Sequence, residues 1–164
     1  KAGMPPSSPS RWRTSSLDGR MKDRSRARGW ALQTLYAWET RGMVEPPARV
    51  LRQLESERRI AESSIPYALE LLSALGDNVQ QVDRTVQGAL SNWRLARLSV
   101  IDRNILRRAT AEMLFLEDVP PGVSIQDAIL LAEKYGTADS PRFVNGVLDA
   151  LMRSLNGEVK RERS

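Results

Sequence analysis

The sequence predicts an all-α protein of about seven helices. After Asp23, apolar residues recur at three- and four-residue spacing over most of the chain, as they do on the buried face of a helix. No segment of strand length alternates convincingly between apolar and polar residues. Prolines and glycines separate the periodic segments at positions where a helix ends or begins. With 164 residues, the chain is most simply one domain.

The N-terminal segment stands out by its composition and charge. Residues 1–21 are rich in proline, serine and arginine and are expected to form a disordered arm. Residues 1–29 hold eight basic and two acidic residues, whereas the rest of the chain holds 17 basic and 18 acidic residues. A localised basic segment indicates an anionic partner, and nucleic acid is the usual one. A solvated arginine-rich leader is the alternative.

Four helices are expected in the first part of the chain. The first should span residues 23–41, because Ala27, Ala31, Leu35 and Trp38 fall on one face. The second helix should begin at Pro46 and Pro47. The third should span residues 60–76 and the fourth residues 77–91.

The fifth and sixth helices carry predicted N-terminal caps. Ser99 and Asp102 have the spacing of a capping box, in which a hydroxyl and a carboxylate each accept a backbone N–H. Two prolines and a glycine then end the fifth helix. Ser124 and Asp127 have the same spacing and are expected to open the sixth helix. Gly136 should close it in a left-handed conformation.

The seventh helix is expected to start at Ser140 and Pro141, since proline suits the first helical position. Asn145 and Gly146 interrupt its apolar stripe, although glycine inside a helix costs about 1 kcal/mol relative to alanine. The pair therefore indicates another backbone packed very close to this helix, or an Asn amide that bonds one.

The composition excludes several kinds of chemistry. The chain has no cysteine and no histidine, so disulfides, thiolate nucleophiles, His bases and most transition-metal sites are ruled out. It contains no glycine-rich phosphate loop, and no pair of carboxylates stands out as a general acid and base. No apolar run approaches the ~18 residues that cross a membrane. We expect a non-enzymatic protein with no cofactor, metal, catalytic residue or membrane partner, in a reducing compartment such as the cytoplasm.

Two groups of residues resemble the NusB family of transcription antitermination factors. The N-terminal group is Arg26-Ala27-Arg28, Ala31-Leu32-Gln33, Leu35-Tyr36 and Trp38. The C-terminal group is Asp102-Arg103, Ile105-Leu106-Arg107, Val119-Pro120, Ser124-Ile125 to Leu131-Ala132, Tyr135-Gly136 and Asp139-Ser140 through Asp149. The resemblance covers roughly residues 22–155 and is weakest between 42 and 98. It implies two helical sub-bundles packed across one another, with an RNA-binding domain over residues 22–156 and a charged tail over 157–164.

The resemblance also implies a ligand, boxA, which is a short single-stranded element of nascent ribosomal RNA transcripts. Transferred by position, the residues that would contact it are Arg24, Arg26 and Arg28, together with Arg142 and Phe143. Arg24 and Arg28 lie one helical turn apart, which suits adjacent phosphates, whereas Arg26 would approach from the flank.

A protein partner is implied as well, namely the small ribosomal protein that doubles as NusE. Asp102 and Asp139 match acidic positions near that surface, and Tyr36 is assigned to it too. Asp102 has a competing explanation as a cap, and Tyr36, like Tyr135, also suits the core. With this partner the protein would join the RNA polymerase antitermination complex. A homodimer is compatible with the resemblance and would cover the RNA surface.

Two other functions stay open at this point. NusB-like domains also form the N-terminal part of RNA cytosine methyltransferases, whose motif tends to read Phe-Val-Asn-Ala-Val-Leu-Arg. This chain differs from that motif at Gly146 and Asp149. The other alternative is a helical protein-interaction module with a basic tail.

Overall fold

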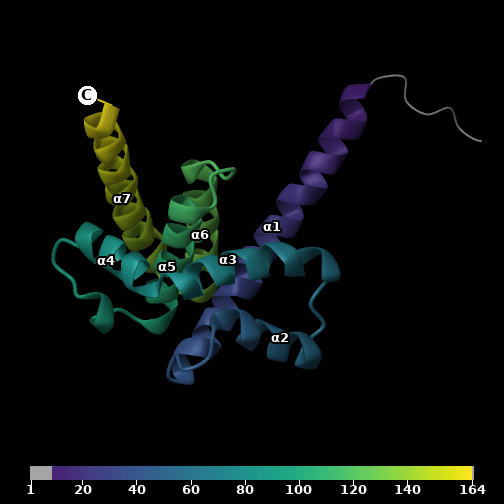
Figure 1. Cartoon of the computed structure of the whole chain (residues 1–164), viewed down its shortest axis with the longest axis horizontal. Coiled ribbons are helices and arrows are strands. Elements are labelled where there is room, and N and C mark those ends of the chain that lie inside the picture. Colours follow the sequence, from purple (N-terminus) through teal and green to yellow (C-terminus); the bar gives the residue numbers. More distant parts are fainter. Residues whose placement is uncertain (1–8, 164) are drawn as a thin grey trace, which may run out of the picture.

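The protein is all-helical, which confirms the predicted fold class (Figure 1). The computed structural model describes the backbone of residues 9–163 and the side chains of residues 19–163. That part of the chain contains seven α-helices, two single-turn 3-10 helices and no strand. The α-helices are α1 (Pro9–Thr40), α2 (Pro47–Glu57), α3 (Ile65–Asp77), α4 (Val79–Ala89), α5 (Val100–Phe115), α6 (Pro121–Tyr135) and α7 (Ser140–Arg163).

The helices form two sub-bundles, as the resemblance implies. Helices α1, α2 and α3 pack against one another, and α4 to α7 form the second group. Helix α5 joins the groups, because it packs against α1 and α3 as well as against α4, α6 and α7. One apolar core runs through both sub-bundles and includes Leu35, Leu72, Ile105 and Leu148. Because α5 is surrounded by other helices, its polar side chains are buried and need partners inside the protein.

Helix α1 begins well before the predicted residue 23. Residues 1–8 of the predicted arm lie outside the described residues, and from Pro9 the backbone runs as a helix into α1. Figure 1 shows that this first part of α1 leaves the body of the protein. The apolar periodicity begins only near Ala27, so it marks where α1 is packed and not where the helix starts. Likewise, α7 continues to Arg163 through most of the predicted charged tail.

One of the two predicted capping boxes is half formed and the other is wrong. The Ser99 hydroxyl accepts a hydrogen bond from the Asp102 backbone N–H at 3.1 Å. The Asp102 carboxylate does not complete the box, since its Oδ1 is buried and has no hydrogen-bond partner in the described part of the chain. Helix α6 already begins at Pro121, so Ser124 and Asp127 lie inside the helix and face other side chains.

Two glycine predictions are also corrected. Gly136 ends α6 with a φ of −90°, so it does not adopt the left-handed conformation. It is instead needed for close packing, because a Cβ there would lie 2.5 Å from the Cβ of Ser140. Asn145 and Gly146 are both exposed, and no atom lies within 4 Å of the place where a Gly146 Cβ would be. The described chain therefore packs no backbone against this pair.

Candidate nucleic-acid interface

The basic face of α1 is turned largely toward the protein. Arg24 and Arg28 do share a face one turn apart, but both meet carboxylates there. Arg28 is only 3% exposed, and its Nε lies 2.7 Å from Glu112 Oε2. Its Nη1 pairs with the carboxylate of Asp127 in α6. Arg28 was expected to contact RNA. The structure instead places its side chain in two buried ion pairs, so it is not available to an RNA strand.

Glu112 of α5 is the centre of this buried cluster. It is fully buried and accepts hydrogen bonds from Arg28, from Arg108 at 3.3 Å, from the Tyr67 hydroxyl at 2.5 Å and from the Ser124 hydroxyl. Burial alone would raise the pKa of Glu112, but the charges of Arg108 and Arg28 outweigh it and lower the pKa below its ordinary value. Burial and the bond to Glu112 raise the pKa of the Tyr67 phenol.

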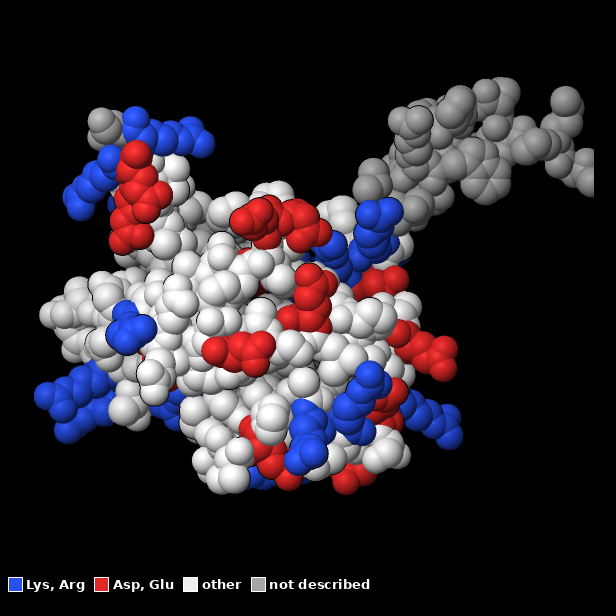
Figure 2. Space-filling model, viewed as in Figure 1, with Lys and Arg blue, Asp and Glu red and all other residues white. Residues whose placement is uncertain are grey.

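Arg24 lies nearer the surface and is also paired. Its Nη2 lies 2.7 Å from Asp118 Oδ2, and its guanidinium carbon lies 4.8 Å from the centroid of the Tyr67 ring. The hydrogen bond from Arg24 lowers the pKa of the Asp118 carboxyl. Figure 2 shows basic side chains where α1 leaves the body, with acidic side chains close beside them. An incoming phosphate would therefore have to replace Asp118 as the partner of Arg24.

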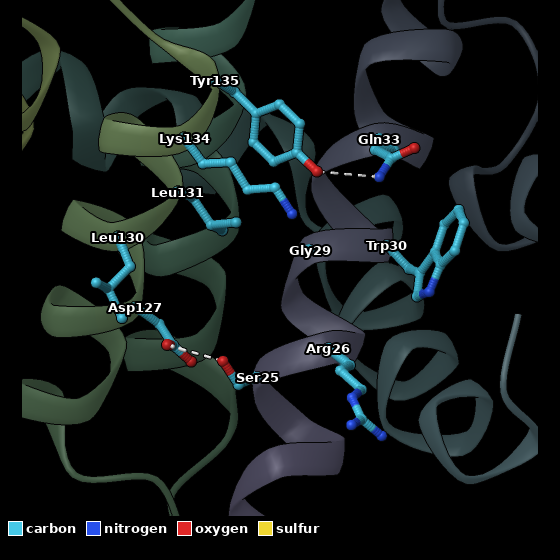
Figure 3. A pocket seen from close by; sticks show the side chains of 10 residues that line it. All are labelled: Ser25, Arg26, Gly29, Trp30, Gln33, Asp127, Leu130, Leu131, Lys134 and Tyr135. Carbon is cyan, nitrogen blue, oxygen red and sulfur yellow. Dashed lines mark hydrogen bonds between the residues drawn. The ribbon is translucent and has the colours of Figure 1, made fainter. Parts of the chain in front are cut away.

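Arg26 lines a groove between α1 and α6, and Figure 3 shows its side chain on the flank of α1 farther from α6, on the same side as Trp30. Within the described chain it is exposed and forms no ion pair. Across the groove, the exposed Lys134 places its Nζ 5.2 Å from the ring centroid of Tyr135, whose hydroxyl accepts a hydrogen bond from Gln33 at 3.2 Å. The groove, of about 360 Å³, is lined by Ser25, Arg26, Gly29, Trp30, Gln33, Asp127, Leu130, Leu131, Lys134 and Tyr135. Two cations beside two aromatic rings suit a nucleotide strand.

Trp30 and Lys134 of this site were not expected from the sequence. One signal was present, because Arg26 and Trp30 are four residues apart and share a face of the helix. The rest depends on how α6 packs on α1, which the bond between Gln33 and Tyr135 fixes across 102 positions of sequence. Spacing within one helix cannot reveal such a pairing.

Arg142 and Phe143 lie at the start of α7 and do not line the α1–α6 groove. Arg142 is exposed, and Phe143 is half-buried. The Phe143 ring meets the ring of Trp93 edge to face, with centroids 6.3 Å apart and an interplanar angle of 75°. The two predicted groups of RNA-binding residues therefore occupy separate places on the surface.

The predicted partner-binding residues are brought together only in part. Tyr36 is 46% exposed and lines a hollow of about 280 Å³ with Ile101, the residue before Asp102. The hollow is lined by Leu32, Gln33, Tyr36, Ala37, Leu54, Arg58, Ile101 and Tyr135. Asp139 is exposed in the loop between α6 and α7 and lies outside this lining.

Two arginines of α5, Arg103 and Arg107, form ion pairs within the protein. Arg103 and Arg107 both bind Glu39 of α1, at 2.6 and 2.8 Å, and Arg107 also binds Asp83 of α4 at 2.8 Å. Burial would raise the pKa of Glu39, but its bonds to the two arginines lower it. These contacts tie α1, α4 and α5 together and leave both guanidinium groups occupied.

No cluster of acidic side chains suited to holding a metal ion occurs in residues 19–163. None of the described helices has the length and apolarity that crossing a membrane requires.

The fold and the groove define an all-helical domain that offers cationic and aromatic side chains to a ligand. The chain belongs to the NusB family, whose family model matches residues 25–153. It is 39% identical over 128 residues to the transcription antitermination protein NusB of Chloroherpeton thalassium, a match that covers 77% of this chain and 60% of that protein. It is 36% identical over 130 residues to the NusB protein of Desulfitobacterium hafniense, covering 79% and 88% of the two chains.

A solved structure shows the same fold. A crystal structure of the antitermination factors NusB and NusE in complex with dsRNA matches with a TM-score of 0.73 and 32% identity, over 82% of this chain and 98% of that one. The two named relatives are transcription antitermination proteins, which agrees with the expectation of a non-enzymatic factor.

Proposed function

We propose that this protein is a transcription antitermination factor that binds single-stranded boxA RNA together with a NusE-type ribosomal protein. The observation that carries the proposal is the α1–α6 groove, where the exposed cations Arg26 and Lys134 lie beside Trp30 and Tyr135. Membership of the NusB family supports it, and the similar structure of NusB and NusE with dsRNA supports binding of RNA and of a NusE-type partner. The protein would act in the cytoplasm, within the antitermination complex of RNA polymerase.

The residues that contact RNA in this proposal differ from those expected from sequence. Arg26 binds a phosphate or stacks on a base, as its planar guanidinium allows. Arg142 and Phe143 take a later part of the strand. Arg24 stays paired with Asp118, and Arg28 serves as a buried support for α1.

The partner would bind the hollow around Tyr36, next to Asp102, and would also contact Asp139, which lies outside the hollow. This hollow and the RNA groove share two lining residues, Gln33 and Tyr135. RNA and protein partner would therefore lie on adjacent surfaces separated by one hydrogen-bonded pair of side chains. Such adjacency allows the partner to add its own contacts to the bound strand.

The mechanism that follows is coincidence binding. The basic groups supply attraction that depends on salt, and the partner adds affinity and sequence discrimination. With about three to five phosphates engaged, the slope of log K against log salt should be roughly −2 to −3.5 for a single strand.

Fluorescence anisotropy with labelled RNA tests the proposal. We expect tighter binding of boxA than of a scrambled strand when the partner is present, and a salt slope in the stated range. Annealing boxA to its complement should weaken binding, because a duplex hides the bases. Equal affinity for boxA and the scramble with the partner present would contradict the proposal, as would binding that salt does not affect.

A further inference from the structure

Trp93 is an exposed aromatic residue held in a fixed loop. It lies between α4 and α5, and 59% of its surface is exposed. The side chain of Gln87 donates to the Trp93 carbonyl oxygen and accepts from the Leu95 N–H, both at 2.9 Å. Arg103 donates to the carbonyl oxygens of Leu95 and Leu98 at 3.1 and 2.6 Å. These bonds hold the backbone at Trp93 and in the residues that follow it, so the exposed indole extends from a well-anchored part of the loop.

Phe143 supports the indole from α7. The two rings meet edge to face, an arrangement that aromatic pairs prefer and that stabilises them beyond the area they bury. One face of an aromatic pair of this kind can receive a third flat ring. The pair joins the loop before α5 to the start of α7, next to the exposed Arg142.

The surface beside Phe143 is open at Gly146. On a helix, a side chain at position i+3 leans back over the residue at position i, so a side chain at 146 would lie over Phe143. Gly146 has no Cβ, and open space lies where one would be. A glycine that costs helix stability without serving any contact of this chain is consistent with a surface kept clear for a ligand.

The charge around the pair favours an anionic ligand. Arg94, Arg97 and Arg142 are exposed and form no ion pair within the described residues. Asp139 and Asp149 also lie near Phe143 in sequence and reduce the net positive charge. Ring stacking, more than charge attraction, should therefore supply most of the affinity at this place.

We propose that Trp93, supported by Phe143, is a stacking platform for one unpaired base of a single-stranded RNA. The inference rests on the proposed function, since it extends the strand beyond the α1–α6 groove. Trp93 has what such a platform requires, an exposed ring that packs against a second ring and extends from an anchored loop. Arg94 and Arg142 would hold the phosphates on either side of the stacked base.

The test uses the full chain with its NusE-type partner and fluorescein-labelled single-stranded boxA RNA. Trp93→Ala should weaken RNA binding by about 5- to 150-fold, the range that one lost base stack implies. Its salt slope should stay like that of the wild type, because no phosphate contact is removed. Trp93→Phe should recover most of the affinity, and annealing the RNA to its complement should remove the difference between Trp93→Ala and the wild type.

Intrinsic fluorescence gives a readout that a merely structural role would not change. The chain has four tryptophans, and a stacked base should quench the one that it covers. With unlabelled boxA, Trp93→Phe should therefore show less quenching than the wild type at saturation. Thermal unfolding of each variant checks that the fold is kept.

The outcomes separate this inference from the proposed function. If the wild type binds no RNA, both fail. Suppose that the wild type binds RNA and that Arg26→Ala weakens this binding. If Trp93→Ala then binds RNA with wild-type affinity, and the fluorescence of Trp93→Phe is quenched by RNA as much as that of the wild type, only the stacking platform is overturned. Loss of partner binding in Trp93→Ala with unchanged RNA affinity would also overturn it, because the surface would then dock a protein.

Discussion

Arg28 of α1 and Glu112 of α5 form an ion pair inside the protein, with 2.7 Å between Arg28 Nε and Glu112 Oε2. This pair shows that the basic residues of α1 have two different roles, since some of them bind carboxylates of the protein and others do not. Arg28, and to a lesser degree Arg24, hold α1 against the body of the protein. Arg26 lines the edge of the groove, is exposed and forms no ion pair within the described residues, so it is available to a ligand.

Replacing Glu112 should destabilise the fold strongly. Glu112→Gln leaves the buried Arg28 and Arg108 without their shared carboxylate, and removing one partner of a buried pair costs about 3–5 kcal/mol. Urea unfolding followed by circular dichroism measures the loss. Asp118→Asn is the matched control, because it removes an acid that pairs with α1 at the surface, where an ion pair contributes about 0–1 kcal/mol. Equal losses in the two variants would show that the Glu112 cluster contributes no more than a surface contact.

The Glu112 cluster should also make stability depend on pH in one direction. The pKa of Glu112 is lower in the folded protein than its ordinary value of 4.5, so the folded state binds this proton less readily than the unfolded state does. The ionised form therefore stabilises the fold above pH 4.5, and this contribution is lost as the pH falls below that value. The free energy of unfolding of the wild type minus that of Glu112→Gln should be constant near neutral pH and shrink in acid. A difference that grows on acidification would contradict the assignment.

Gly146 should make the protein less stable than an alanine at the same position would. Gly146→Ala has open space for its methyl group, so it should stabilise the protein by about 1 kcal/mol through the helix preference of alanine. Gly136→Ala is the control, because its Cβ would lie 2.5 Å from Ser140 Cβ and should destabilise by about 1–3 kcal/mol. Thermal and chemical unfolding report both values. A destabilised Gly146→Ala variant would mean that the helix surface there is not free.

Tyr36 should matter to the protein partner and little to the fold. Tyr36→Ala removes an exposed ring from the hollow beside Ile101 and should weaken binding of the NusE-type protein by about tenfold or more, as interface tyrosines often do. Val44→Ala is the control, since Val44 is 86% exposed and lies outside the hollow. Isothermal titration calorimetry measures both affinities. Unchanged partner affinity in Tyr36→Ala would show that the partner does not bind the hollow around Tyr36.

Much of the fold could be predicted from sequence, because helical periodicity and local start signals depend on neighbouring residues. The seven helices and the Ser99 cap are examples. Which arginine of α1 faces inward could not be predicted, since Glu112 and Asp127 lie 84 and 99 positions from Arg28. For the same reason the spacing of Ser124 and Asp127 suggested a cap, although both side chains bind residues of other helices.

The most direct test of the central claim compares Arg26→Ala with Arg24→Ala in RNA anisotropy titrations over a range of salt concentrations. Arg26→Ala should bind boxA more weakly and lower the magnitude of the salt slope by about 0.7, the change for one phosphate contact on a single strand. Arg24→Ala should keep the wild-type slope, because Arg24 is paired with Asp118. The opposite pattern, a changed slope in Arg24→Ala and none in Arg26→Ala, would contradict the account.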